Sequence, residues 1–315
     1  MIKRIVIVLI AILVVFLGRG LFFYSGFYSA PPSEMPSYEH IVIPAASSSD
    51  FYDVYEPGEG SILFDLSHNN AFDIEELDVL MSRLIARGLS IDFLSEEDNL
   101  KEKLLGIKEE EEEGDEEEGD EEEASDGEIE TADAYIIVCP QEEFSTKERE
   151  TVDQFISNGG KLLLIADPTR SSKINSISLK FGLVFEPGYL YNMKENDANY
   201  RNIFVAEFKG GKITEELEKI ALYTAGAITS ADGGIAFVDQ NTFSSVIETR
   251  QRLSPIALTR GSKVLAVYDL TFMTEPYNGI LGNNQLISNI ADWLSSPTEE
   301  EKEEQEEGVK STDEG

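Results

Sequence analysis

Hydrophobic and polar positions along this chain fall into blocks that predict strands followed by helices. The apolar run "SILFDL" (61–66) predicts a buried strand, and "DIEELDVLMSRLIARG" (73–88) has apolar residues at helical spacing and ends in glycine. "SIDFL", "AYIIVCP" and "KLLLIADP" predict further strands, and "STKERETVDQFISNGG" (145–160) predicts a capped helix. Almost wholly apolar strands that alternate with helices are typical of a parallel sheet covered on both faces, so the pattern predicts an α/β domain.

The second half of the chain is richer in strand patterns. "NIFVAEF", "IALYTAGAIT", "GIAFVDQ", "SPIALTR" and "KVLAVYDL" each predict a strand between residues 202 and 270. "NNQLISNIADWL" (283–294) predicts a closing helix with one apolar face, formed by Leu286, Ile287, Ile290, Trp293 and Leu294. The α/β domain is therefore expected to span residues 61–296.

The N-terminus predicts a membrane segment. Thirteen apolar residues, "IVIVLIAILVVFL", follow Lys3 and Arg4, and residues 5–27 reach the roughly 20 needed to span a bilayer. As a signal peptide the segment has a poor cleavage site, because Tyr28 and a following proline flank "SAP". As an anchor the segment contains Arg19, whose side chain can extend to the outer membrane interface. We expect residues 1–28 to be an uncleaved single-pass anchor, with the N-terminus cytoplasmic and the body extracytoplasmic in the cell membrane.

Charge is concentrated in two tracts. The formal net charge is -36, and residues 109–130 contribute 16 acidic and no basic side chains. The segments 108–130 and 297–315 are expected to be a disordered insertion within one domain and a disordered tail, because neither can bury apolar surface. Residues 29–60, rich in Pro, Ser and Tyr, are expected to be a stalk. This acidic balance excludes nucleic acid as a partner, and the single cysteine excludes an internal disulfide.

Three segments together resemble a known family. They are "DLSHNN" (65–70), "ADAYIIVCP…STKERETVDQFISNGGKLLLIADPT" and "GSKVLAVYDLTFMTEPYNGILGNNQLISNIADWL". They resemble the DUF4350 family of the class I glutamine-amidotransferase-like superfamily. Relatives there include gliding-motility and ABC-transporter auxiliary proteins and the N-terminal domain of an intraflagellar-transport protein. The resemblance covers about residues 60–296 without the acidic insertion. It implies a flavodoxin-like three-layer α/β/α sandwich with a mainly parallel sheet, often tethered to a membrane and without an established activity.

Two departures from this superfamily bear on activity. Its amidotransferases carry a nucleophilic cysteine on the turn after the strand that here reads "KLLLIADPTR", but that turn offers Ala166, Asp167, Pro168 and Thr169. Cys139 lies one strand earlier, without a glycine-rich elbow. Relatives often show Gly-Asp-Ser-Asp-Phe late in the chain, where this chain reads "YDLTF" and has Thr271 in place of the second aspartate. These departures weigh against an enzyme of this kind, because the cysteine of the nucleophile elbow is absent.

Polar residues follow several predicted strands and form the candidate site. Ligands of open α/β sheets bind at the carboxyl ends of the strands. The candidate ligand-binding residues are Asp65, Ser67, His68, Asn70, Asp167, Asp269 and Asn278. The simpler interpretation is that "DLSHNN" is a strand-to-helix turn and that the aspartates cap helices and hold turns. We expect no metal and no cofactor, since no metal-binding motif supports one.

These observations predict a membrane-anchored, extracytoplasmic, non-catalytic binding or scaffold domain. The resemblance implies a partner in an ABC transporter or another envelope complex, besides the membrane itself. One alternative is a hydrolase or amidotransferase-like enzyme that uses the strand-end rim around His68, with Cys139 as nucleophile. Another is a purely structural surface protein with an acidic exterior.

Overall fold

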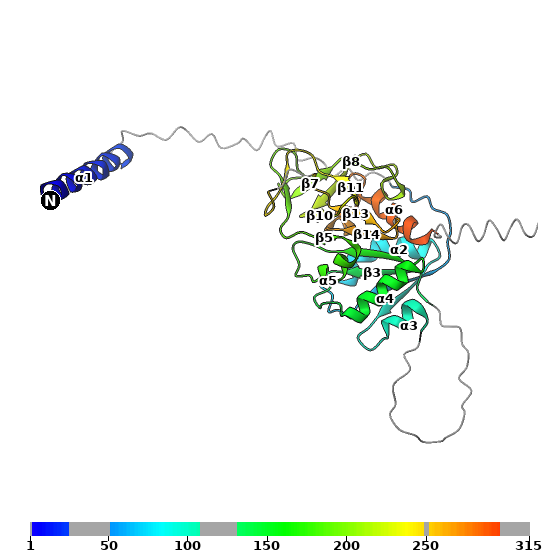
Figure 1. Cartoon of the computed structure of the whole chain (residues 1–315). Coiled ribbons are helices and arrows are strands. Elements are labelled where there is room, and N and C mark those ends of the chain that lie inside the picture. The colour runs from blue at the N-terminus through cyan, green and yellow to red at the C-terminus, as the bar shows by residue number, and fades with distance from the viewer. Residues whose placement is uncertain (1, 25–50, 108–130, 249–251, 297–315) are drawn as a thin grey trace, which may run out of the picture. The chain divides into compact units, whose positions relative to one another are not determined.

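The computed structural model describes residues 2–24, 51–107, 131–248 and 252–296 (Figure 1). The chain divides into two compact units, Met1–Ile43 and Pro44–Gly315. The predicted acidic insertion 108–130, the tail 297–315 and residues 29–50 of the predicted stalk lie outside the described residues.

The first unit contains the apolar helix α1 (Ile2–Tyr24). Its segment Lys3–Tyr24 has a mean hydropathy of 2.9. By length and composition this helix can cross a membrane or serve as a signal sequence.

The second unit is built on a central sheet with the strand order β2-β1-β3-β4-β14-β13-β11-β8. The first five strands of this order pair in parallel, and the remaining pairs are antiparallel. The parallel strands are β2 (Ser90–Leu94), β1 (Ser61–Asp65), β3 (Ala134–Val138), β4 (Lys161–Ile165) and β14 (Val264–Val267). The others are β13 (Ile256–Thr259), β11 (Gly234–Phe237) and β8 (Glu207–Phe208). The predicted α/β class and mainly parallel sheet are confirmed.

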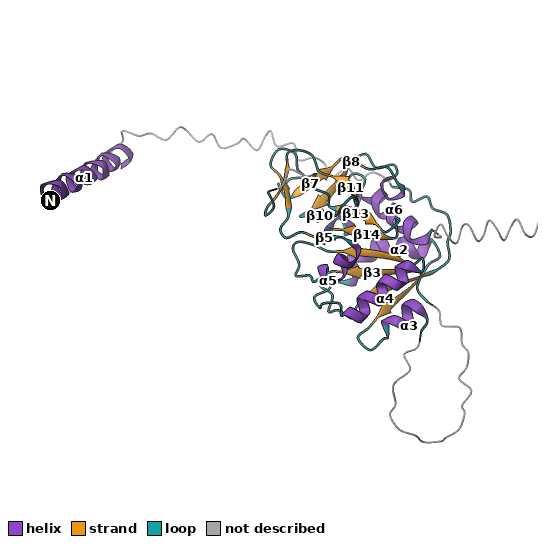
Figure 2. Cartoon of the chain, in the orientation of Figure 1, coloured by secondary structure: helices purple, strands orange, loops and turns teal. Residues whose placement is uncertain are grey.

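The central sheet packs against helices, which Figure 2 shows in purple beside the orange strands. Successive strand residues point to opposite faces, so Phe64 and Leu63 of β1 belong to different buried clusters. The first cluster includes helices α2 (Asp78–Ala86) and α6 (Asn283–Ser295). The second includes α3 (Leu100–Leu105), α4 (Thr146–Ser157) and α5 (Asn175–Ser178). The unbroken apolar runs in the sequence reflect this burial on both faces.

The second half of the body is more broken than its sequence pattern predicts. "IALYTAGAIT" forms two strands, because Thr224 has a left-handed φ of 65° and Gly226 packs against the ring of Tyr268. The body also contains three two-stranded sheets. They pair β10 (Ile228–Thr229) with β5 (Val184–Phe185), β12 (Thr242–Ser244) with β6 (Leu190–Asn192), and β7 (Asn202–Val205) with β9 (Ile220–Tyr223).

Short 3-10 helices complete the described elements. They are η2 (Ile74–Leu77), η3 (Leu179–Phe181), η4 (Lys212–Thr214), η5 (Thr271–Met273) and η6 (Tyr277–Gly279). The single helix predicted over 73–88 is thus a 3-10 turn followed by α2.

A buried arginine joins the chain before β1 to the body. Arg87 at the end of α2 is fully buried and donates to both carboxylate oxygens of Asp53, at 3.0 and 3.1 Å. Its Nε donates to Asp292 of α6 at 2.6 Å, and its guanidinium lies 4.7 Å from the ring centre of Tyr55. The stalk was predicted to run to residue 60, and within it Asp53 and Tyr55 contact the body through Arg87. A buried charge must be compensated by hydrogen bonds or opposite charge, and Asp53 supplies part of this compensation for Arg87.

Removing the Arg87 side chain should destabilise the body strongly. Arg87→Ala removes the charge-assisted hydrogen bonds to Asp53 and Asp292, and a loss of about 1.5–3 kcal/mol is expected. Urea unfolding of the full chain in detergent, followed by the fluorescence of the single tryptophan, Trp293, would measure the loss. The control is Lys103→Ala, which breaks an exposed pair with Asp92 and should cost about 1 kcal/mol or less. Equal losses in the two variants would contradict a structural role for Arg87.

Candidate functional site

Four of the predicted site residues meet at the carboxyl end of β1, around the Asp65 carboxylate. Asp65 is only 1% exposed. It accepts hydrogen bonds from Ser67 Oγ at 2.8 Å, from His68 Nδ1 at 2.9 Å and from Asn70 Nδ2 at 3.1 Å. Asn69 between them adopts a left-handed φ of 48°, which asparagine tolerates better than most residues. The sequence "DLSHNN" therefore folds into a turn whose polar side chains satisfy one buried carboxylate.

This turn is tied to the next strand of the sheet. Asn70 Nδ2 also donates to the carbonyl oxygen of Val138, the last residue of β3, at 2.8 Å. The carbonyl oxygen of His68 accepts from the backbone of Gln141 and Glu142 in the loop that leads to α4. The predicted local role of Asn70 is thus accompanied by a long-range one, which positions the loop after β3.

His68 lies between two carboxylates and against an aromatic ring. Its Nε2 is 3.5 Å from Glu148 Oε1, opposite the Nδ1 contact with Asp65. Its ring stacks on Phe144 with centroids 3.7 Å apart and planes inclined by 17°. Glu148 is held in place because its other oxygen accepts from the backbone of Ser145, the N-cap of α4. Both ring nitrogens of His68 are therefore engaged.

The two carboxylates favour the charged form of His68. Burial by itself lowers the pKa of His68, which is only 4% exposed. The hydrogen bond to Asp65 and the charges of Asp65 and Glu148 outweigh burial and raise the pKa above its ordinary value of 6.5. Beneath this group, burial followed by the charge of Asp65 raises the pKa of Tyr135 on β3. The tyrosine hydroxyl is therefore neutral.

A groove of about 620 Å³ opens beside this group. Ser67 and Glu148 line it, together with the loop after β2 and the start of α4. Its charged residues are five acids and two lysines, namely Glu96, Glu97, Asp98, Glu142, Glu148, Lys101 and Lys147. The groove is therefore suited to a cationic group rather than to an anion.

Asp167 and Asp269 form a second group, at the ends of β4 and β14. Asp167 accepts from Thr169 N and Oγ1 on its own turn and from the backbone of Leu270 at 3.2 Å. Asp269 is fully buried and accepts from the backbone of Tyr223. Burial, followed by the charge of Asp167, raises the pKa of Asp269 well above its usual range. These contacts agree with the turn-holding role that the sequence favoured for the aspartates.

The seven predicted site residues thus fall into three places. Among the described residues, no side-chain hydrogen bond or ion pair joins the Asp65 group to Asp167 or Asp269. Asn278 lies in η6, where its backbone donates to Thr274. The site comprises Asp65, Ser67, His68 and Asn70, with Phe144 and Glu148 added by the fold. A capping box was visible at Ser145–Glu148 in the sequence, but its contact with His68 was not.

Cys139 follows β3 and lies beside the site turn, because its carbonyl oxygen accepts from the backbone of Ala71. It is fully buried, and its backbone donates to Ile165. Burial raises the pKa of its thiol to about 12. Its backbone has a left-handed φ of 44°, which is rare for a residue with a side chain. In the described residues, no group of three or more His, Cys, Asp or Glu side chains is arranged to hold a metal ion.

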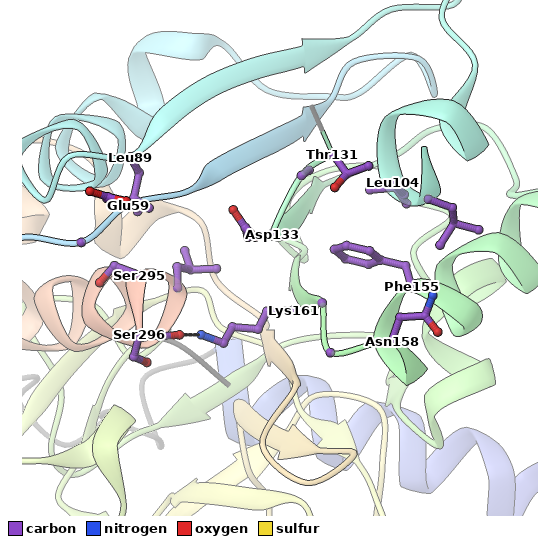
Figure 3. Close-up of a pocket in the computed structure, with 16 residues that line it drawn as sticks. Glu59, Leu89, Leu104, Thr131, Asp133, Phe155, Asn158, Lys161, Ser295 and Ser296 are labelled. Atoms are coloured by element: carbon purple, nitrogen blue, oxygen red, sulfur yellow. Dashed lines mark hydrogen bonds between the residues drawn. The ribbon is translucent and has the colours of Figure 1, made fainter. Parts of the chain in front are cut away.

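A second pocket, of about 480 Å³, lies at the opposite edge of the sheet, where the strands begin (Figure 3). Its buried cation, Lys161, donates to the carbonyl oxygens of Trp293 and Ser296 at the end of α6. Asp133 in the same pocket accepts from the backbone of Ser61. Lys161 binds carbonyl oxygens at the end of α6, and Asp133 binds the backbone at the start of β1. Both charged groups of this pocket therefore have structural roles.

Comparisons with known proteins show similarity at the level of fold. No family model matches the chain, and no curated protein matches it. Among solved structures, the mmIFT52 N-terminal domain is 14% identical with a TM-score of 0.58, covering 75% of this chain and 97% of that one. A thua-like protein from Parabacteroides merdae ATCC 43184 is 10% identical with a TM-score of 0.42, covering 76% and 91%. Alpha-L-fucosidase isoenzyme 2 from Paenibacillus thiaminolyticus is 11% identical with a TM-score of 0.40, covering 75% and 32%. The first of these supports the fold alone.

The position of His68 predicts a pH-dependent contribution to stability. Because its folded pKa is raised, the stabilisation is complete below about pH 6.5 and is lost as the pH rises through the folded pKa. His68→Asn should therefore cost about 1–3 kcal/mol at pH 6 and less at pH 9. Urea unfolding at both pH values measures this. The control is His40→Asn, the only other histidine, which lies outside the described residues. A loss that grew with pH would contradict the charged state of His68.

Proposed function

We propose that this protein is a membrane-anchored, non-catalytic binding domain. In this proposal α1 remains as a single-pass anchor, with Lys3 and Arg4 on the cytoplasmic side and the body outside the cell membrane. The length and apolar composition of the helix support an anchor, as does the poor cleavage site after it.

We also propose that the body is a flavodoxin-like three-layer α/β/α sandwich of the DUF4350 and amidotransferase-like kind. The order of the five parallel strands, β2-β1-β3-β4-β14, supports this, since it follows the 2-1-3-4-5 order of flavodoxin-like folds. Two buried clusters, one with α2 and α6 and the other with α3 and α4, support the three layers. A role beside an ABC transporter or another envelope complex follows from the family resemblance and from the anchor.

The engaged state of His68 is the observation that carries the non-catalytic proposal. A general base must be neutral and within reach of the proton it abstracts. His68 instead directs Nδ1 to Asp65 and Nε2 to Glu148, and its raised pKa favours the cation. Two contacts to carboxylates stiffen the turn, and a raised pKa makes the imidazole less available as a neutral base.

The groove beside His68 is the proposed binding surface. Its five carboxylates, two of them from Glu96 and Glu97 on the exposed loop after β2, favour a cationic segment of a partner protein. Glu148 lines this groove and also contacts His68, so its carboxylate belongs to both the groove and the candidate site.

The alternative proposal is a hydrolase or amidotransferase-like enzyme. One observation favours it, the left-handed backbone of Cys139 at the end of β3, because strained residues gather at functional sites. Complete burial of the thiol and a pKa of about 12 oppose it, since the thiolate is the nucleophile.

Binding of a four-lysine peptide to the full chain in detergent tests the proposed groove. Glu96→Gln with Glu97→Gln should weaken binding about threefold or more, because each exposed ion pair contributes about 0.2–1 kcal/mol. The matched control is Glu215→Gln with Glu218→Gln, which removes the same charge from exposed positions outside the groove. Isothermal titration calorimetry compares the affinities. Equal weakening in both double variants would show attraction to overall charge alone and would contradict the groove.

A further inference from the structure

The two carboxylates that contact His68 differ in their access to solvent. The side chain of Asp65 is fully buried, whereas that of Glu148 is 34% exposed and lines the acidic groove. His68 is not among the described residues that line the groove. A ligand in the groove would therefore meet Glu148 directly and His68 only through Glu148.

His68 is the group of this cluster whose charge changes near neutral pH. Asp65 at the end of β1 and Glu148 on α4 are the charged groups that act on its imidazole. Phe144 covers one face of the ring and carries no charge. The charges of the same two carboxylates also act on Tyr135 of β3, and burial raises the pKa of its phenol, which is neutral. An imidazole is the side chain that ordinarily titrates between about pH 5 and 8.

Glu148 carries the charge state of His68 to the groove. Its Oε1 lies 3.5 Å from His68 Nε2, and its Oε2 accepts from the backbone of Ser145 at the start of α4. A protonated imidazole at this distance offsets the negative charge that Glu148 presents to a ligand. A neutral imidazole leaves that charge uncompensated. Charges near a protein surface interact more strongly than they do in bulk water, so the difference should affect binding.

We propose that the protonation state of His68 controls the affinity of the acidic groove for its cationic ligand. This inference rests on the proposed function, because it requires a cationic segment to bind in the groove. A proton on His68 and a cation beside Glu148 compete for the same carboxylate, so each lowers the affinity for the other by the same factor. The groove binds its ligand more tightly when His68 is neutral, and ligand binding in turn releases a proton from His68.

The surroundings of His68 set the direction and the pH range of this effect. Burial lowers the pKa of His68, but the hydrogen bond to Asp65 and the charges of Asp65 and Glu148 outweigh burial and raise it above 6.5. The proton is therefore held at pH 6 and is lost as the pH rises through the folded pKa. Affinity should rise about threefold from pH 6 to pH 9, the size expected for one partly exposed ion pair.

Calorimetric titration of the full chain in detergent with a four-arginine peptide, at constant ionic strength, tests the inference. Arginine keeps its charge over this pH range. Affinity should rise about threefold from pH 6 to pH 9. Proton release at pH 7.5 should appear as a difference between the binding heats in phosphate and in Tris buffer. His68→Asn should abolish both effects. Glu148→Gln should also abolish them, and glutamine can still form the capping box with Ser145.

Two control variants separate this coupling from the general charge of the groove. Glu97→Gln removes an exposed carboxylate of the same groove that does not act on His68. It should weaken binding at both pH values and keep the threefold rise. His40→Asn replaces the only other histidine and should change neither the affinity nor its pH dependence.

The outcomes distinguish failure of this coupling from failure of the proposed groove. Absence of peptide binding at pH 6, 7.5 and 9 would overturn the groove and the coupling together. Binding with equal affinity at pH 6 and pH 9, without proton release, would overturn the coupling alone. A pH dependence that persists in His68→Asn or in Glu148→Gln would also overturn it, because another group would then be responsible.

Discussion

The strand-end site depends on one buried charge, the carboxylate of Asp65. A charge out of contact with water is tolerated only when hydrogen bonds and opposite charge compensate it. Here Ser67, His68 and Asn70 supply them from one short turn. Because Asn70 also reaches the end of β3, the same carboxylate fixes how the first turn meets the next strand. Removing the Asp65 carboxylate would leave His68 Nδ1 and Asn70 Nδ2 without their shared acceptor.

The same compensation connects the strand-end turn to the acidic groove. His68 lies between Asp65 and Glu148, and Glu148 also lines the groove. An acidic surface attracts cationic segments, which supports the binding role proposed for this groove.

Local pattern was sufficient to predict much of the fold, but not the parts set by tertiary contacts. The strands at 61–65, 134–138 and 161–165 were predictable, because burial on both faces requires unbroken apolar runs. The turn "DLSHNN" was also predictable, because its polar side chains form hydrogen bonds within the turn itself. Phe144, Glu148 and the Arg87 network were not predictable, since each acts across more than 30 residues of chain. The break at Thr224 depends on the packing of Gly226 against Tyr268, which no local signal reports.

The reactivity of the Cys139 thiol tests the central claim, that the strand-end site holds no usable nucleophile. A fully buried thiol with a pKa of about 12 should react with a disulfide reagent such as dithionitrobenzoate only after the chain opens. At pH 8 the native full chain should react at least about a thousandfold more slowly than the same chain unfolded in urea, given a typical stability of about 5 kcal/mol or more. Native reaction as fast as that of an exposed thiol would show a reachable nucleophile after β3 and would contradict the non-catalytic account.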